Sequence, residues 1–593
     1  TSKSGLFASL DNAEISNLVI ASAQVNAKGL YSAVLAGHIS GNTTLNNISV
    51  KDSNVASDGI YSGIIVGAIT SGSIKMSEIR VDNCSVNSKA NYVGAVAGSA
   101  SSNGTIANIE VSNSKLNGAE YVGGIIGLAE GKLEIKTISV DGLTVKGVSE
   151  VSGIAAGKGD VSISDAKVIS SEISTIAGTS AFVAGGISSS FGSSISNVEI
   201  RSTAIKAGIA SSIVGKANAN ARLSIKKVNI YGVNVRAEKA NSVAAGILAV
   251  YNTAGAVTID DCSIDSMSNV TSASIVSGIV GDITGAESAL VANNIKSFAK
   301  VELLASVDAV AAGGAVAKLS AAALNNVQLS NVKILGNVIG NAAVGGMIGA
   351  VKGIGNFNGM TAVVSDSVIA AQIKTEINNK NAGVVIGYVE NDRAVNSDNI
   401  DTLITGTVIS TYFGNVSAFG KSTEIKSAGI VDMDKPNGSA ITPSADTIST
   451  VGETEIQLSN LPKVTGYSFD RATGWVSEAN DRIGVVSSSE DRLVVKVNHM
   501  ADISVVAYYV SDTDNDVRIP VHFAIKSDVR TPLKGAGTYE SPYLVSNAYD
   551  LETVAYYDSE GKYFALTSDV TFGKDDFEFG GGFYNVGNGV VTI

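Results

Sequence analysis

Three aspartates at alternate positions form the best candidate metal site in this 593-residue sequence. Asp512, Asp514 and Asp516 belong to the run Asp512-Thr-Asp-Asn-Asp516, which lies between two strand-like segments. Carboxylates spaced this way on a tight turn can coordinate Ca²⁺ through hard oxygen ligands. The calcium-loop pattern with a central glycine is missing, however. The sequence therefore favours a polar hairpin turn, leaves Ca²⁺ as the alternative, and indicates no other cofactor.

The two cysteines could form a disulfide only if the fold brings their side chains together. Cys84 and Cys262 occur in similar phrases, Val81-Asp-Asn-Cys-Ser-Val86 and Ile259-Asp-Asp-Cys-Ser-Ile264, which predicts one shared position in two distant repeats. Six repeats at a strand spacing of ~4.8 Å separate them by roughly 29 Å. A disulfide needs Cα atoms within about 7 Å. We therefore expect two small, buried, free thiols.

Acidic residues are spread along the chain instead of gathering on one face. Glycan-cleaving enzymes need paired carboxylates at a fixed separation. Scattered acids are typical of an ordinary solvated surface. The sequence thus predicts no catalytic residue and a protein that is not an enzyme. The acids in question include Glu110, Asp141, Asp165 and Glu199.

The elements that carry these side chains follow from a seven-residue phrase that returns about every thirty residues. Clear copies are Tyr92-Val-Gly-Ala-Val-Ala-Gly98, Tyr121-Val-Gly-Gly-Ile-Ile-Gly127 and Ala343-Val-Gly-Gly-Met-Ile-Gly349, and a degenerate copy ends at Gly420. A fixed period in this range is typical of a solenoid. Because the repeat is rich in β-formers and glycine, it predicts an all-β fold, a right-handed parallel β-helix of about twelve or thirteen coils.

The glycines of this phrase also invite comparison with phosphate-binding loops. No Walker lysine and no strand–loop–helix context follows them. We therefore expect these glycines to allow one coil to approach the next closely, and we expect no nucleotide site.

A second phrase in each repeat has the pattern apolar, any, Asn, apolar, any, apolar. Strict alternation slips by one residue at the asparagine, so both flanking apolar side chains can point inward. This slip predicts a bend between two strands, where asparagine tolerates the left-handed conformation. Stacked amides could also bond along the rod. The phrase contains Asn17, Asn47, Asn108, Asn197 and Asn326, and other repeats place Glu78, Asp165 or Lys227 nearby.

Proline marks the end of the repeat array. All six prolines lie at positions 436, 443, 462, 520, 532 and 542. A strand that is paired on both edges needs every ladder N–H, so stacked coils exclude proline. Residues 1–434 are therefore predicted to form the β-helix.

The segment 435–530 has a different pattern. Short alternating runs, such as Arg492-Leu-Val-Val-Lys-Val497, recur between turns, and the only tryptophan, Trp475, lies here. This pattern predicts an immunoglobulin-like β-sandwich. Beyond it, residues 531–593 contain a predicted short helix near 547–557.

Charge and hydropathy exclude two classes of partner. The net charge is −13 and the isoelectric point is about 4.9, which argues against a nucleic-acid partner. No uninterrupted run of eighteen apolar residues occurs, so we expect no direct membrane insertion.

Two parts of the chain resemble a known kind of bacterial surface module. Gly5-Leu6-Phe7, followed by Ala13-Glu-Ile-Ser-Asn-Leu18, resembles the opening coils of GLUG-motif β-helix proteins. It is also similar to the non-catalytic N-terminal β-helix region of immunoglobulin A-cleaving zinc metalloproteases. The segments Gly535–Val545 and Gly561–Asp569 resemble the part that caps such helices. The resemblance implies that 531–593 is the capping segment and first strands of a further β-helix module.

The resemblance brings no catalytic residue with it. The zinc motif of the proteases, His-Glu-x-x-His, is missing, since the only histidines are His38, His499 and His522. In such proteins the capping segment precedes the Gly-Leu-Phe coil, whereas here it comes last. Residue 593 would read naturally into residue 1, so we expect one period of a tandem array with neighbouring copies or repeats end to end.

These patterns predict a non-enzymatic structural or adhesive protein of a bacterial surface, forming a stiff stalk or fibre. Its expected location is extracellular, and its further partners would be a host or bacterial surface glycan or protein. The alternative is the non-catalytic arm of a secreted enzyme, or a glycan-active β-helix enzyme.

Overall fold

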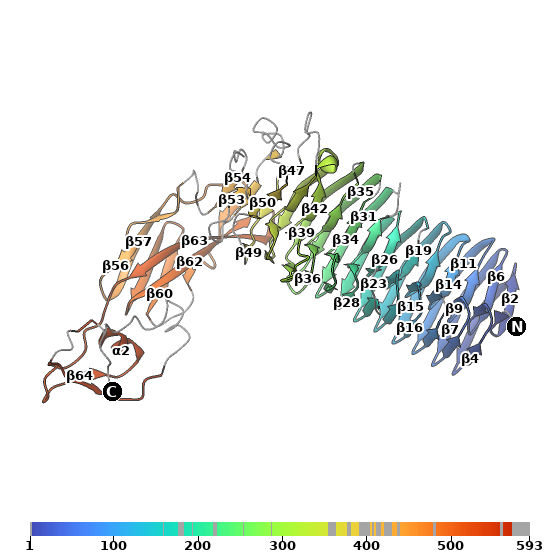
Figure 1. The fold of residues 1–593 in the computed structure, drawn as a ribbon, viewed down its shortest axis with the longest axis horizontal. Helices are drawn as coiled ribbons and strands as arrows, with labels where there is room; N and C mark the ends of the chain where they lie inside the picture. Colours follow the sequence, from blue (N-terminus) through green and yellow to red (C-terminus); the bar gives the residue numbers. More distant parts are fainter. Residues whose placement is uncertain are drawn as a thin grey trace. The chain divides into compact units, whose positions relative to one another are not determined.

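The computed structural model divides the chain into two compact units, Thr1–Ile430 and Val431–Ile593 (Figure 1). The division falls a few residues before the predicted boundary at 434. The structure describes residues 3–571 except 90, 158, 176–182, 193, 218–221, 253, 286, 354–362, 376–380, 391–403, 406–407, 411–416, 420–429, 434, 436–438, 478–481, 555 and 558–560.

The first unit is an all-β parallel solenoid, as predicted. A representative coil contains β15 (Asn103–Ser112), β16 (Lys115–Asn117), β17 (Tyr121–Gly123) and β18 (Ile126–Ala129). Each strand pairs in parallel with its counterparts in the coils before and after, and the coils stack from blue to green in Figure 1. The strands of the solenoid form three sheets of 26, 16 and 12 strands. A typical coil contributes two short strands to the largest sheet and one strand to each of the other two.

The coils are stacked in register. The pairing β11 (Ser73–Asp82) to β15 to β19 (Leu133–Asp141) places Ile79, Ile109 and Ile138 in one column. These side chains are almost fully buried. Burying one such side chain contributes about 1.5–3 kcal/mol, so the stacked columns are a main source of stability. The smallest sheet has twelve strands, which define eleven coil-to-coil steps in the described residues. The degenerate copy of the seven-residue phrase that ends at Gly420 is not fully within the described residues.

The asparagine phrase marks a left-handed residue inside one continuous strand. Asn47 (φ 53°) lies within β7 (Thr43–Lys51), and Asn108 (φ 55°) lies within β15. The predicted bend is therefore present, but it does not separate two strands. Because this residue resets the alternation, the apolar residues on both sides point inward. Glu78, Asp165 and Lys227 take the same conformation, at φ 55°, 53° and 54°.

The prediction for Asn326 is wrong. Asn326 ends a 3₁₀ turn, η1 (Ala321–Asn326), and the left-handed residue of that coil is Asn331 (φ 51°) in β43 (Val327–Ile334). This extra turn comes before β43 in the chain. The asparagine phrase that contains Asn326 therefore does not align with the asparagine phrases of the other coils.

In the coil of β17 and β18, two glycines of the seven-residue phrase leave no room for a Cβ, although other coils have serine or alanine at the first of these positions. A Cβ on Gly123 would lie 1.8 Å from the carbonyl oxygen of Ile126, across the sharp bend between β17 and β18. A Cβ on Gly127 would lie 2.5 Å from the oxygen of Gly98 in the preceding coil. The contact of Gly127 confirms the expected close approach between coils. The contact of Gly123 shows a further role for glycine, at a bend within one coil.

The second unit contains two mainly antiparallel sheets. One includes β57 (Gly452–Ser459), β61 (Arg492–Val497) and β60 (Ile483–Ser489). The other is built on the long hairpin of β62 (Ala501–Ser511) and β63 (Asp514–Ser527). The buried Trp475 contacts Phe469 and Phe523.

The chain then forms a small element after these sheets. β64 (Tyr543–Val545) pairs in parallel with β65 (Phe564–Leu566), and helix α2 (Ala548–Val554) lies between them in sequence. The helix falls inside the predicted range 547–557.

Candidate functional sites

The three aspartates lie at the β62–β63 hairpin, as the favoured prediction required. Ser511 is paired with Asp514, so Asp512 and Thr513 form the turn. Asp512 Oδ1 accepts a hydrogen bond from Ser468 Oγ at 2.7 Å, and Asp514 Oδ1 accepts one from the Asp516 N–H at 3.3 Å. Among the described residues no three His, Cys, Asp or Glu side chains are grouped as a metal would need. Calcium binding by Asp512, Asp514 and Asp516 stays a prediction.

The cysteines do not share one position, contrary to the sequence prediction. Cys84 lies in the turn after β11, whereas Cys262 lies within β35 (Gly255–Ile264) and pairs with Val228. The coil of β11 has two left-handed residues, Glu78 (φ 55°) and Asn83 (φ 48°), and Asp261 (φ 55°) corresponds to the first of them, whereas Cys84 follows the second. Similar residues surround both bends, which explains the misleading likeness of the phrases.

Both thiols are free and buried, as expected. Cys84 Sγ donates to the Asp82 carbonyl at 3.2 Å, and Cys262 Sγ donates to the Asp260 carbonyl at 3.3 Å. Burial raises the pKa of both thiols, that of Cys262 to about 12. A buried thiol whose pKa is raised is a poor nucleophile, so burial argues against a redox or catalytic role for either cysteine.

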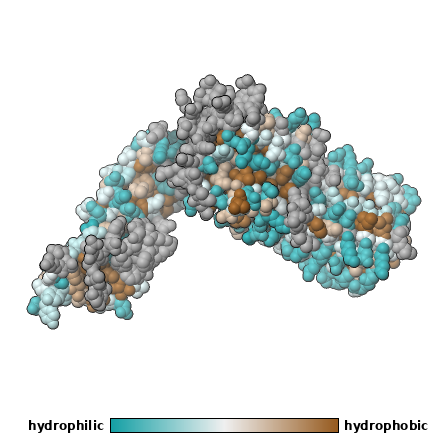
Figure 2. All heavy atoms as spheres, in the orientation of Figure 1, coloured by the Kyte–Doolittle hydropathy of each residue, from teal (hydrophilic) through white to brown (hydrophobic). Residues whose placement is uncertain are grey.

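Three of the four scattered acids have a polar partner, and for Glu110 and Asp165 this partner lies in a neighbouring coil. Glu110 forms an ion pair with Arg80 of the preceding coil at 3.5 Å, and Glu199 forms one with Arg201. Asp165 accepts a hydrogen bond from Asn197 at 2.5 Å, while Asp141 is exposed at the end of β19. Exposed pairs of this kind contribute about 0–1 kcal/mol each. On the face shown in Figure 2, hydrophilic side chains surround smaller hydrophobic patches, as a solvated rod requires.

Two separate hollows lie along the smallest sheet of the solenoid. One has a volume of about 370 Å³ and is lined by Asp58 and Lys89 among others, and the second has about 560 Å³ and is lined by Lys146 and Glu172 among others. Both volumes are within the range of ligand sites. The carboxylate in each hollow has a cationic partner, since Asp58 lies 3.1 Å from Lys89 and Glu172 lies 3.1 Å from Lys146. The arrangement therefore resembles a charge-balanced surface more than a general acid–base pair.

Amides stack along the bends, as the sequence suggested. Asn47 Nδ2 donates to Asn17 Oδ1 at 2.8 Å, and Asn331 Nδ2 donates to Asn294 Oδ1 at 3.2 Å. Each bond joins consecutive coils outside the backbone ladder, so the left-handed asparagine both forms the bend and ties it to its neighbour.

An aromatic ladder was missed by sequence reasoning. The rings of Tyr31, Tyr61, Tyr92 and Tyr121 stack with centroids 5.1, 4.9 and 5.5 Å apart. Each tyrosine opens a copy of the seven-residue phrase, and this was the available signal. Because the ring faces contact one another, the ladder presents edges and hydroxyl groups to solvent. Burial is the main cause that raises the pKa of Tyr61 and Tyr92.

His38 lies at one end of this ladder, with its ring centroid 5.1 Å from that of Tyr31. Its Nε2 is 2.9 Å from Thr70 Oγ1, and its Nδ1 is 3.2 Å from Ser9 Oγ. Burial and the nearby Lys3 ammonium lower the pKa of His38. Lys3 Nζ also lies 3.3 Å from Nδ1, and because an ammonium can only donate, this contact favours a neutral histidine that bridges three coils. No acid of a catalytic triad is among these contacts.

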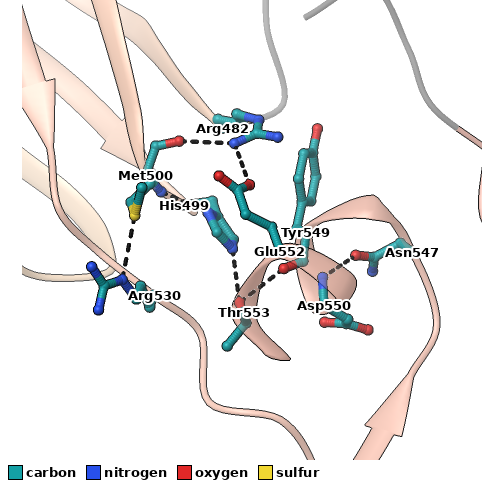
Figure 3. Close-up of polar contacts among 9 residues, drawn as sticks. All are labelled: Arg482, His499, Met500, Arg530, Asn547, Tyr549, Asp550, Glu552 and Thr553. Atoms are coloured by element: carbon teal, nitrogen blue, oxygen red, sulfur yellow. Dashed lines mark hydrogen bonds and ion pairs between the residues drawn. The ribbon is translucent and has the colours of Figure 1, made fainter. Parts of the chain in front are cut away.

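The second unit contains a polar cluster that ties the C-terminal segment to the two sheets (Figure 3). Arg482 is buried, and its Nη1 donates to Glu552 on α2 at 2.8 Å and to the Met500 carbonyl at 3.2 Å. The guanidinium also lies over the ring of Tyr549, 4.6 Å from its centroid. Removing one partner of a buried pair usually costs several kcal/mol, so α2 is firmly held on the sheets.

His499 completes the same cluster. The Met500 N–H donates to His499 Nδ1 at 2.7 Å, which leaves the proton on Nε2 facing Thr553 Oγ1 at 3.2 Å. The Thr553 hydroxyl in turn donates to the Tyr549 carbonyl at 2.8 Å. Burial, together with Arg482, lowers the pKa of His499, while Glu552 and Asp550 oppose that change. This network accepts only the neutral ring.

We expect the second unit to lose stability in mild acid because of His499. Its pKa is lowered in the folded state, so the unfolded state takes up the proton first and stability falls as the pH drops below about 6.5. The thermal midpoint of this unit, measured between pH 8 and 5, should decrease, and His499→Gln should flatten the profile over that range. A wild-type midpoint that stays constant, or an unchanged slope in the Gln variant, would exclude this role.

Comparisons with known proteins give little further guidance. No family model matches the chain, and no curated protein matches it. Two solved structures are weakly similar, both of mutants of the tailspike protein of Escherichia coli bacteriophage HK620. The one in complex with pentasaccharide shows 11% identity and a TM-score of 0.24, covering 82% of this chain and 86% of that chain. The other shows 10% identity and a TM-score of 0.21, covering 85% of this chain and 84% of that chain. In the part of the chain that the structure describes, no helix is long and apolar enough to cross a membrane.

Proposed function

We propose that this chain is a non-enzymatic structural rod of a bacterial surface, acting as a stiff stalk or fibre unit outside the cell. The observation that carries the proposal is the parallel register that successive coils share through the long sheet, in which each strand templates the next. Eleven steps at ~4.8 Å give a stack of about 50 Å. Bending it would stretch backbone ladders and apolar columns in several coils at once, so the unit resists deformation.

The side-chain ladders support a mechanical role. Tyrosine rings, asparagine amides and ion pairs all join neighbouring coils on the outside of the solenoid. Each contact is weak by itself, but together they add axial links between neighbouring coils. The charge balance around Glu172 and Lys146 also favours the structural role over the alternative of a glycan-active enzyme.

Within this proposal the second unit serves as a spacer, joint or binding head. Its two sheets act as an immunoglobulin-like sandwich, and 531–593 acts as the GLUG-type capping start of a further right-handed β-helix module. Support comes from the parallel β64–β65 pair, because parallel pairing is the basic unit of a β-helix. A surface glycan or protein would be the ligand of an adhesive head.

Two measurements on the whole chain test the proposal. Intact producing cells are treated with a protease that cannot enter them, and surface glycans are incubated with purified protein and assayed for new reducing ends. We expect loss of the chain from the cells and no new reducing ends. Protection of the chain in intact cells would contradict the location, and glycan turnover would favour the enzymatic alternative.

A further inference from the structure

Two neighbouring hollows lie beside the turn between β60 and β61 in the second unit. Their volumes are about 460 and 600 Å³, within the range of small-molecule sites. Their walls come from the loop before β58 (Tyr467–Phe469), from β58 with the turn that follows it, and from the β60–β61 turn. The residues that line both hollows are Pro462, Lys463, Phe469, Arg471 and Glu490.

Arg471 and Lys463 bring two cations to this wall. Both side chains are exposed, and neither forms an ion pair, a side-chain hydrogen bond or a ring contact within the part of the chain that the structure describes. The other arginines of the second unit each contact an acid or an aromatic ring, and they are Arg482, Arg492, Arg518 and Arg530. Arg471 is therefore available to an anionic group from outside the chain.

The turn that carries Arg471 is held in place by Asp470. Asp470 Oδ1 accepts a hydrogen bond from the Ala472 N–H at 3.1 Å, and Oδ2 accepts one from the Thr473 hydroxyl at 2.7 Å. Arg518 pairs with the same carboxylate. Because these contacts fix the backbone at Arg471, a ligand that binds there loses less affinity to ordering of the loop.

The β60–β61 turn is fixed by buried aromatic side chains. Trp475 Nε1 donates to the Glu490 carbonyl at 2.9 Å, and the Trp475 N–H donates to Ser488 Oγ at 2.8 Å. The Tyr509 hydroxyl donates to Glu490 Oε1 at 3.3 Å. Burial, with the Glu490 carboxylate, raises the pKa of Tyr509, so this hydroxyl keeps its proton. Glu490 Oε2 accepts no hydrogen bond from the described residues and can accept one from a ligand.

The mixture of charges indicates which ligand fits. A carboxylate can accept charge-assisted hydrogen bonds from Arg471 and Lys463, and hydroxyl groups of the same molecule can donate to Glu490. The buried Phe469 offers apolar surface to the C–H face of a ring. A sugar acid carries all three features on one ring. A polyanion, such as a sulfated chain or an acidic peptide, would be repelled by Glu490 and Asp491.

We propose that these hollows bind a sugar acid, which is a hexose ring with one carboxylate, as part of a surface glycan. Arg471 and Lys463 bind the carboxylate, and Glu490 accepts hydrogen bonds from the ring hydroxyls. The inference rests on the proposed function, because it names the ligand class of the adhesive head.

The test measures binding of two matched sugars to the whole chain. Methyl glucuronide and methyl glucoside differ only at carbon 6, where the first has a carboxylate and the second a hydroxymethyl group. Saturation-transfer difference NMR, titrated with each sugar, gives the Kd. The variant is Arg471→Gln, and the matched control is Arg492→Gln, since Arg492 lines neither hollow and its side chain is 52% exposed. Thermal midpoints confirm that each variant is folded.

We expect wild type to bind methyl glucuronide with a Kd on the order of 1 mM, as a ligand of this size allows. Methyl glucoside should bind at least about tenfold more weakly, because it lacks the charge-assisted hydrogen bonds. Arg471→Gln should weaken the binding of methyl glucuronide by a similar factor, and Arg492→Gln should bind it as wild type does.

Several results would overturn the proposal. Methyl glucuronide could fail to bind at about 20 mM, methyl glucoside could bind equally well, or Arg471→Gln could bind as wild type does. Tighter binding of glycine or of a tetraglutamate peptide would indicate a ligand of another class. The comparison of the two sugars needs no variant, so it decides the matter even if a substitution disturbs the fold. A failure here leaves the rod standing, because its location and the lack of glycan turnover are measured separately.

Discussion

Glu110→Pro is expected to break the solenoid open at its fourth coil. Glu110 lies in the middle of β15, in register between Arg80 of β11 and Ser139 of β19. Its side chain is exposed, so the substitution leaves the apolar columns unchanged. Proline removes a ladder N–H and leaves a buried acceptor unpaired, and its ring crowds the neighbouring strand. We expect a loss on the order of 3 kcal/mol or more.

Limited proteolysis and thermal denaturation check this result. New cleavage should appear near residue 110 together with a lower midpoint. The matched control is Glu110→Ala, which removes only the ion pair with Arg80, whose side chains are 59% and 58% exposed. That change should cost about 0–1 kcal/mol. If the proline variant is as stable as the alanine variant, the strand is not paired on both edges.

Gly123→Val should have an effect of similar size for a different reason. The added Cβ would lie 1.8 Å from the Ile126 oxygen and 3.1 Å from the Ile154 oxygen, both of them backbone atoms. Since neither atom belongs to a flexible side chain, the bend between β17 and β18 must open and displace the next coil. Overpacking of this kind costs about 1–3 kcal/mol or more, and unfolding in denaturant measures it.

The control for the glycine variant uses the same position in another coil. Ala245 occupies it between Ser211 and Ser277 in the ladder. Ala245→Ser should therefore be nearly neutral, because both neighbours already carry a serine there. An equal loss in the two variants would show that side-chain chemistry, not the tightness of the bend at Gly123, decides stability at this position.

The repeat, the parallel fold and most bends could be predicted because each depends on a short sequence pattern that recurs in every coil. Asn47 and Asn108 could be identified from one slip in alternation, and the proline-free sequence indicated strands paired on both edges. The period predicted about twelve or thirteen coils, and the twelve strands of the smallest sheet define eleven coil-to-coil steps in the described residues. These features depend on residues close in sequence and on the same contacts repeated many times.

The failures share one physical cause, which is that similar local sequences occur at different places in a coil. Cys84 and Cys262 follow different left-handed bends, and Asn326 belongs to an inserted turn. The Arg482–Glu552 pair could not be predicted at all, because its partners are 70 residues apart and occur once. A single long-range contact leaves no periodic signal in one sequence.

The central claim is that successive coils lie in register, and engineered disulfides test it most directly. Outward-facing register partners, such as Ser49 with Arg80 and Lys167 with Glu199, are replaced in pairs by cysteine. Adjacent strands ~4.8 Å apart lie within disulfide reach, so these pairs should oxidise nearly completely. The control pair Ser49 with Asp82 is displaced by two residues and should stay reduced. Equal oxidation of matched and displaced pairs, or none in either, would contradict the stacked solenoid.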